Sequence, residues 1–176
     1  MLAINRLTVR SKLTKEELLR SVKFSVDDGE TFGLIGESGS GKSMTSKCIM
    51  RLLNSRAFQI QGEIRWKGRD VFSMNAKELA DYRGKQISMI PQNPMTAFAP
   101  MVKLGKQLEM GFQFSSKEER HNFSRKLTNT LASVNLSDAE KIFNSYPDEL
   151  SGGMLQRVMI ALTMLQAPKL IIADEI

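Results

Sequence analysis

The sequence predicts an α/β protein with buried parallel strands, two strand-like segments near its N-terminus and a helical segment in its middle. Two short apolar runs, at residues 31–35 and 170–173, have the composition of buried parallel strands. The segments 2–9 and 18–26 are strand-like and straddle a polar connection. From about residue 95 to residue 150 the pattern turns helical and more polar. These features place the chain in the α/β class.

A glycine-rich segment follows the run 31–35 directly. It consists of Gly36-Glu37-Ser38-Gly39-Ser40-Gly41-Lys42-Ser43 and fits the P-loop pattern G-x-x-x-x-G-K-S/T. Glycines let backbone N–H groups turn inward around phosphates, and the N-terminus of the next helix adds the positive end of its dipole. In this pattern Lys42 reaches the β- and γ-phosphates of a nucleotide, and Ser43 ligates Mg²⁺.

The residues behind the loop form one stripe of a helix. The stripe consists of Met44, Cys48, Ile49 and Leu52. Phosphate binding by a P-loop needs a strand, a glycine loop and a helix in this order. The alternative is a glycine turn that matches the pattern by chance, and this order of elements argues against it. Cys48 is the only cysteine of the chain, and its place on the inward stripe predicts a packing role.

Three further segments follow the loop in a recognisable order. They are Ile90-Pro91-Gln92-Asn93-Pro94, Leu150-Ser151-Gly152-Gly153-Met154-Leu155-Gln156-Arg157 and Leu170-Ile171-Ile172-Ala173-Asp174-Glu175. Together with the P-loop, this order resembles the Walker A, Q-loop, LSGG signature and Walker B motifs of an ATP-binding-cassette (ABC) ATPase. The resemblance covers essentially the whole chain. It implies a P-loop NTPase core of the RecA type, with N-terminal antiparallel strands and an inserted α-helical subdomain.

The last predicted strand presents two acids at its carboxyl end, where ligands bind in open α/β sheets. Asp174 is expected to hold Mg²⁺, directly or through water, and the resemblance makes Glu175 the catalytic carboxylate that polarises the attacking water. The alternative interpretation is a strand that ends in two solvated acids without a function. The motifs that precede this strand argue against that interpretation. The resemblance also gives Gln92 a contact with Mg²⁺ and the attacking water, and gives its loop a contact with a transmembrane partner.

The LSGG segment opens a helix that is predicted over about residues 153–165, and Ser151 is a suitable N-cap for it. A well-capped helix is one interpretation. The other is a second anion site, in which the Ser151 hydroxyl and the N–H groups of Gly152 and Gly153 face a phosphate. The resemblance favours the second interpretation, because two such domains pack head to tail and the LSGG of each closes on the γ-phosphate held by the other.

The composition and the net charge argue against a membrane-spanning, a secreted or a nucleic-acid-binding protein. No run approaches the ~18 apolar residues needed to span a membrane, and the N-terminus resembles a strand more than a secretory signal. The net charge is +6, but the basic residues are scattered and no nucleic-acid-binding signature accompanies them. We therefore expect no nucleic acid partner. His121, the only histidine, lies in a polar helical segment and is expected at the surface.

The residues within and around the motifs indicate one branch of the transporters. Residues 90–98, the segment 146–149 and the signature resemble the ATP-binding subunits of peptide and nickel importers. This implies ATP and Mg²⁺ as ligands and a peripheral position on the cytoplasmic side of the cell membrane. It implies transmembrane permease subunits and a second ATPase subunit, identical or different, as partners, with a substrate-binding protein acting indirectly. Peptides and nickel or metal chelates both stay open as cargo.

We expect three parts: an ATP-binding core over 1–94, a helical subdomain over 95–150, and the signature helix with the Walker B strand over 151–176. No aromatic residue lies near Leu13, where the family stacks adenine, so an aliphatic contact is expected there. The D-loop, the switch-histidine segment and further core strands do not follow Glu175, so we expect a core without its C-terminal part. Hydrolysis by this chain is left open. The alternatives are a module that binds ATP without hydrolysing it and a cassette ATPase of translation or DNA repair.

Overall fold

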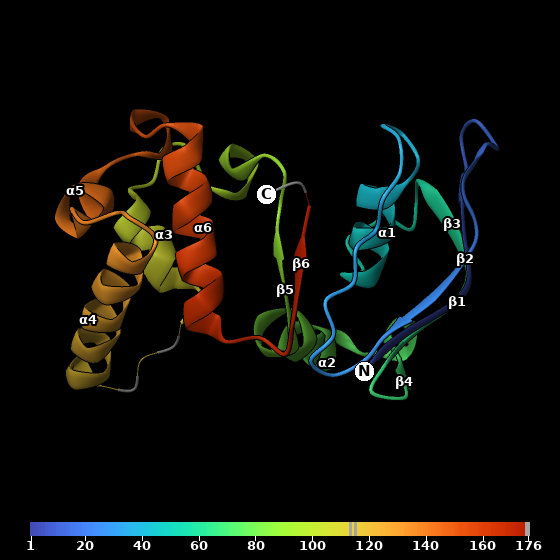
Figure 1. The fold of residues 1–176 in the computed structure, drawn as a ribbon, viewed down its shortest axis with the longest axis horizontal. Helices are drawn as coiled ribbons and strands as arrows, with labels where there is room; N and C mark the ends of the chain where they lie inside the picture. The colour runs from blue at the N-terminus through green and yellow to red at the C-terminus, as the bar shows by residue number, and fades with distance from the viewer. Residues whose placement is uncertain (113, 115, 175–176) are drawn as a thin grey trace. The chain divides into compact units, whose positions relative to one another are not determined.

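The computed structural model describes residues 1–112, 114 and 116–174. The chain divides into two compact units, Met1–Asp81 and Tyr82–Ile176 (Figure 1). The division predicted from the sequence, with a helical subdomain over 95–150, is a finer one and stays a prediction.

The first unit is built on an antiparallel sheet of four strands in the order β2-β1-β3-β4. The strands are β1 (Leu2–Ser11), β2 (Glu17–Val26), β3 (Phe58–Trp66) and β4 (Arg69–Asp70). The two N-terminal strands predicted from the sequence are confirmed, and β1 pairs with both β2 and β3. The polar connection between β1 and β2 carries Leu13, whose side chain is 91% exposed.

An irregularity in β1 keeps its apolar side chains in the core. Its buried positions change from even to odd numbers along the strand: Leu2, Ile4, Leu7 and Val9. The pairing with β3 shifts its register between Asn5 and Thr8, which restores the inward direction of the later residues. Opposite the shift, Gly62 has a φ of +98°, and a Cβ there would lie 2.3 Å from the Arg6 carbonyl oxygen. A glycine is therefore needed where the two backbones approach.

The strand predicted at residues 31–35 does not form, so that prediction is wrong. Within the described part of the chain, no strand pairs with this segment. Its apolar side chains are partly open to solvent, with Phe32 and Leu34 each 41% exposed and Ile35 96% exposed. Phe32 stacks on Phe24 of β2 instead, with ring centroids 4.7 Å apart. An apolar run becomes a buried strand only where neighbouring strands accept its backbone hydrogen bonds.

One helix, α1 (Lys42–Ile49), follows the glycine-rich loop of this unit. Cys48 and Ile49 are buried as predicted. Leu52 is 52% exposed, so the predicted stripe extends too far, because the helix ends before that residue. The 3₁₀ turn η1 (Val71–Ser73) and helix α2 (Ala76–Asp81) complete the unit.

The second unit contains a parallel pair of strands, β5 (Ile87–Ile90) and β6 (Leu170–Ala173). Ile87 pairs with Leu170 and Ile90 with Ala173, so the two strands run in register and end together. The single π-helical turn η2 (Tyr82–Gln86) leads directly into β5. The strand predicted at residues 170–173 is confirmed.

The helical part of the second unit packs around α6 (Gly152–Gln166). The other elements are η3 (Pro94–Ala97), α3 (Leu104–Met110), α4 (Lys117–Ser133), α5 (Ala139–Asn144) and η4 (Pro147–Glu149). Figure 1 shows α6 between helices α4 and α5 on one side and the β5–β6 pair on the other, and α6 is in contact with β5. Leu155, Val158 and Ala161 of α6 are fully buried in the shared core. The helical pattern predicted for 95–150 is confirmed.

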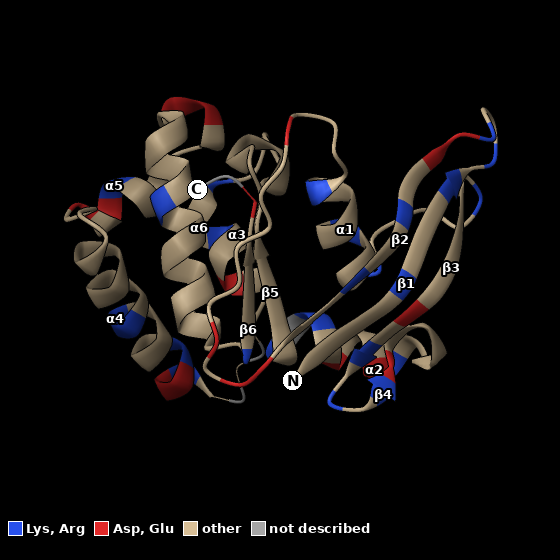
Figure 2. Ribbon diagram, turned by 45° about the vertical axis from the view of Figure 1, so that its right-hand side comes forward, with Lys and Arg blue, Asp and Glu red and all other residues tan. Residues whose placement is uncertain are grey.

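The surface charge is mixed. Figure 2 shows basic and acidic positions interspersed along the elements. His121 lies at an exposed position of α4. Among the described residues, no helix combines the length and the apolar character that crossing a membrane requires.

Candidate nucleotide-binding site

The P-loop, residues 36–43, folds into a tight turn in which Gly39 and Gly41 have left-handed φ values that favour glycine. Gly41 is the N-cap of α1 and has a φ of +94°, in the left-handed region. A Cβ at Gly41 would lie 2.3 Å from Cδ2 of Leu19, which is buried. A Cβ at Gly36 would lie 2.6 Å from Oγ of Ser40, across the loop. Residues 36–40 are exposed, so a ligand can approach the loop backbone from solvent.

Lys42 closes the loop into a ring. Its Nζ donates to the carbonyl oxygens of Gly36, at 2.7 Å, and Glu37, at 2.8 Å. These two bonds hold the ammonium group against the beginning of the loop, while the backbone of Lys42 begins α1. The loop thus carries a positive charge fixed by its own carbonyls, beside the positive end of a helix dipole. This is the electrostatic environment that a polyphosphate needs.

Helix α1 is anchored at the same end. Thr45, which is almost fully buried, donates from Oγ1 to the Gly41 carbonyl oxygen at 2.9 Å. The first turn of α1 has no acidic residue, so no negative charge on the helix opposes an anion there. Thr45 is not among the residues predicted from the motifs, although a threonine four residues after the last loop glycine is a usable signal for this bond. Ser43 is half-buried in the same turn.

Burial of the inward face of α1 gives Cys48 a neutral thiol. Desolvation raises the pKa of the Cys48 thiol to about 12, from an ordinary value of 9.0. A thiol in this state is neither a good nucleophile nor a metal ligand near neutral pH. Its role is packing, as the sequence predicts.

The second unit brings Gln92 and Asp174 to the same edge of its two-stranded sheet. The backbone N–H of Asp174 donates to the Ile90 carbonyl oxygen at 3.0 Å, which extends the ladder one residue past β6. Gln92 follows β5 by two residues and is exposed. Asn93 accepts a hydrogen bond from the Met95 N–H at 3.0 Å and so fixes the turn after Gln92. Glu175 lies outside the described residues.

The signature segment lies at the exposed beginning of α6. Ser151 is the N-cap, and its Oγ accepts a hydrogen bond from the Met154 N–H at 3.3 Å, as expected for a cap. Gly152 and Gly153 are exposed, and a Cβ on either would meet nothing within 4 Å. No acidic residue lies in the first turn. The N-terminus of α6 is therefore open to solvent in the described part of the chain.

Residues 19–176 match the family model described as ABC transporter. The metal-staphylopine import system ATP-binding protein CntD of Staphylococcus aureus (strain NCTC 8325 / PS 47) is 41% identical over 175 residues. That match covers 99% of this chain and 64% of CntD. The oligopeptide transport ATP-binding protein OppD of Bacillus subtilis (strain 168) is 41% identical over 160 residues, with 90% of this chain and 45% of OppD covered. The chain thus spans about half to two thirds of the length of these relatives.

A solved structure has a similar fold. It is a dimeric, post-hydrolysis state of the ATP-binding cassette MJ0796 bound to ADP and Pi. The TM-score is 0.81 at 26% sequence identity, and the match covers 99% of this chain and 73% of that one. The predicted P-loop NTPase fold is confirmed by this likeness.

Proposed function

The chain belongs to the ABC transporter family, and on that premise we propose that it acts as an ATP-binding subunit of an importer for peptides or metal chelates. The observation that carries the proposal is the closed ring of the P-loop, in which Lys42 is bound to the Gly36 and Glu37 carbonyls. The relatives that import oligopeptides and metal-staphylopine support the class of cargo.

The residues of the P-loop fit the phosphates of ATP. Residues 36–40 of the loop are exposed, which leaves their backbone open to a ligand. Lys42 would bind the β- and γ-phosphates, and the N–H groups between Glu37 and Ser43 would donate to their oxygens. The exposed Leu13 would contribute an aliphatic contact to adenine.

Ser43, Gln92 and Asp174 are the proposed protein contacts of Mg²⁺. The described residues contain no group of three or more histidine, cysteine or acidic side chains that could hold a metal alone. Proteins usually bind Mg²⁺ through one or two groups together with substrate phosphates and water. When bound, the ion neutralises charge that develops on the phosphates. Glu175, with Gln92, would orient the attacking water.

The signature segment supports a dimer as the working unit. Ser151, Gly152 and Gly153 lie open at the start of α6, where they would close on the nucleotide of a second ATPase subunit. The relatives' names as import-system and transport proteins support transmembrane permease subunits as partners, with a substrate-binding protein acting indirectly. The subunit would then lie at the cytoplasmic side of the membrane as a peripheral protein.

ATP turnover tests the proposed hydrolysis. The rate is measured for the purified 176-residue chain and for a form extended through a D-loop and switch-histidine segment, each with and without the change Glu175→Gln. Turnover that appears in the extended form and is lost with Glu175→Gln supports the proposal. If only the extended form is active, the short chain is an ATP-binding module. Turnover that survives Glu175→Gln in both forms contradicts the role of Glu175.

Transport assays test the class of cargo. The extended form is expressed in one strain that lacks its oligopeptide ATPase subunit and in another that lacks its metal-chelate ATPase subunit. Restored uptake of a labelled peptide or of a labelled metal chelate supports the proposal and distinguishes the two cargoes. Binding to ribosomes or DNA, with uptake restored in neither strain, would favour a non-transport ATPase.

A further inference from the structure

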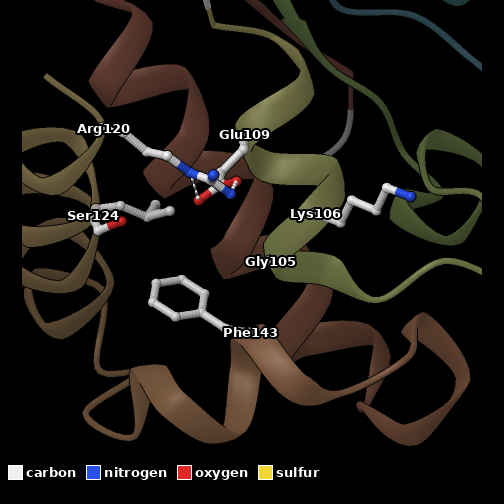
Figure 3. A pocket seen from close by; sticks show the side chains of 7 residues that line it. Gly105, Lys106, Glu109, Arg120, Ser124 and Phe143 are labelled. Atoms are coloured by element: carbon white, nitrogen blue, oxygen red, sulfur yellow. Dashed lines mark hydrogen bonds and ion pairs between the residues drawn. The ribbon is translucent and has the colours of Figure 1, made fainter. Parts of the chain in front are cut away.

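A groove in the second unit lies apart from the residues assigned to ATP. It has a volume of about 450 Å³ and lies between α3, α4 and α5. Figure 3 shows the labelled residues around it: Gly105, Lys106, Glu109, Arg120, Ser124 and Phe143. Its volume is within the range of about 300–1,000 Å³ that is common for small-molecule sites.

The walls of the groove are held in place by contacts of their own. The backbone N–H of Leu104 donates to the Ser145 carbonyl oxygen at 2.9 Å, which fixes the start of α3 to the end of α5. A Cβ at Gly105 would lie 2.9 Å from the Phe143 carbonyl oxygen, so the two helices touch there. Gln107 of α3 bonds to both the N–H and the carbonyl of Ala99, at 2.7 and 2.9 Å. The groove is therefore preformed, which lowers the cost of ligand binding.

One ion pair spans the groove from α3 to α4. Arg120 donates from Nη2 to Oε2 of Glu109 at 2.5 Å and from Nε to Oε1 at 3.3 Å. Both carboxylate oxygens of Glu109 are thus occupied, and a cationic ligand would have to displace Arg120. The Arg120 side chain is 62% exposed, and its Nη1 has no acceptor among the described residues.

Two more donors line the groove. Among the residues that the structure describes, none forms an ion pair with Lys106 or a hydrogen bond with the hydroxyl of Ser124. In Figure 3 the Lys106 side chain extends away from the Glu109–Arg120 pair, on the exposed side of α3. With two cations and one anion, the lining carries one positive charge in excess. Phe143 and Leu127 supply an apolar wall beside these donors.

We propose that this groove binds a small organic anion, in which a carboxylate is carried on an aromatic or other apolar body. The carboxylate would accept hydrogen bonds from Nη1 of Arg120, from Ser124 and from Lys106, which can turn inward on its flexible chain. The apolar body would cover Phe143 and Leu127. The site is independent of the proposed ATP site, because none of these residues belongs to the P-loop, the Q-loop or the signature.

Benzoate is a suitable probe, and its neutral analogue benzamide is the matched comparison. Titration of the ¹⁵N-labelled chain with benzoate should give saturable shifts of amide signals from α3, α4 and α5. Arg120→Gln and Lys106→Gln should each weaken benzoate binding by about tenfold, the effect of losing one charge-assisted hydrogen bond. Arg125→Gln and Lys103→Gln, which change exposed cations outside the groove lining, should leave it unchanged.

Three results would overturn the proposal. The first is the absence of saturable shifts in α3, α4 and α5. The second is equal binding of benzoate and benzamide, or of benzoate and inorganic phosphate, which would show that the charge or the apolar body contributes nothing. The third is loss of the benzoate shifts in Lys42→Ala, which would place the anion in the P-loop. Circular dichroism of Arg120→Gln checks the fold, and Lys106→Gln keeps the test valid if Arg120→Gln is unfolded.

Discussion

Two helices of this chain, α1 and α6, begin at glycine-rich segments that are predicted to face phosphates, but their N-termini differ in construction. The beginning of α1 is enclosed: Gly41 caps it in a left-handed conformation, and Lys42 bonds back to two loop carbonyls. The beginning of α6 is open: Ser151 caps it with a side-chain oxygen, and Gly152 and Gly153 face free space. Neither helix has an acidic residue in its first turn.

The two N-termini differ in whether the residues of one chain suffice to bind a phosphate. The loop before α1 supplies backbone donors and a full positive charge from the same chain, so it can hold a polyphosphate by itself. The N-terminus of α6 supplies a hydroxyl and the partial charge of a helix dipole, worth about 0.3–1 kcal/mol at an exposed position. It therefore needs a phosphate that is already held elsewhere. This contrast supports the head-to-tail dimer proposed above.

Removing the charge of the P-loop should have the largest effect. Lys42→Ala should weaken ATP binding by at least about 100-fold, since each lost charge-assisted bond costs about 1.5–3 kcal/mol. Isothermal titration with ATP measures the change. Lys47→Ala, at an exposed position of the same helix, should keep the affinity of the unchanged chain. If Lys42→Ala and Lys47→Ala bind ATP with equal affinity, the P-loop is not the ATP site.

Adding a methyl group to the enclosed loop should destabilise the fold. Gly41→Ala should lower the free energy of unfolding by about 3 kcal/mol, from left-handed strain and the clash with Leu19. Urea unfolding measures this loss. Gly39→Ala is the control for strain alone, because Gly39 has a φ of +81° but open space around it. Gly153→Ala, at the open N-terminus of α6, should leave the free energy of unfolding unchanged. A decrease as large as that of Gly41→Ala would contradict the difference between the N-termini of α1 and α6.

High pH should weaken the packing of α1 and spare that of α6, whose buried residues Leu155, Val158, Ala161 and Thr163 do not titrate. The thiol of Cys48 loses its proton near pH 9 when unfolded and near pH 12 when folded. Below pH 9 the thiol is protonated in both states and does not change the stability. Above pH 9 the unfolded chain is stabilised by ionisation of its thiol while the buried thiol stays protonated, so the free energy of unfolding falls as the pH rises. The loss is about 1.4 kcal/mol per pH unit.

Urea midpoints between pH 8 and 10.5 measure this effect, and Cys48→Ala is the control. The unchanged chain should lose about 2 kcal/mol more over this range than Cys48→Ala, which has no thiol to ionise. Parallel curves for the two proteins would mean that the thiol is already accessible to solvent in the folded state.

Removing the cap of the open helix should have the smallest effect. Ser151→Ala should cost about 1 kcal/mol of stability, the usual value of an N-cap, while ATP binding by the monomeric chain stays unchanged. Thermal unfolding and titration with ATP check the two parts. Ser151→Asn should restore the cap. Weaker binding of ATP by the Ser151→Ala monomer would mean that α6 contacts the nucleotide of its own chain.

Local patterns in the sequence were sufficient for most of the elements. The N-terminal strand β1, the apolar run of β6 and the N-cap of α6 each depend on residues near one another in the chain, and each is confirmed. The prediction for 31–35 is wrong because the conformation of an apolar run depends on partner strands distant in the sequence. The prediction that Leu52 belongs to the helical stripe is wrong for a similar reason, because the spacing of apolar residues does not show where a helix ends.

The sequence by itself determined the family, the order of the motifs and the chemical type of each candidate residue, because these depend on residue identity and spacing alone. Folding was needed to show that Lys42 closes the loop on its own carbonyls, that Leu19 packs against Gly41, and that a groove lined by basic side chains lies between α3, α4 and α5. These features join residues that the chain brings together only on folding. No local pattern encodes them, since packing geometry sets each distance.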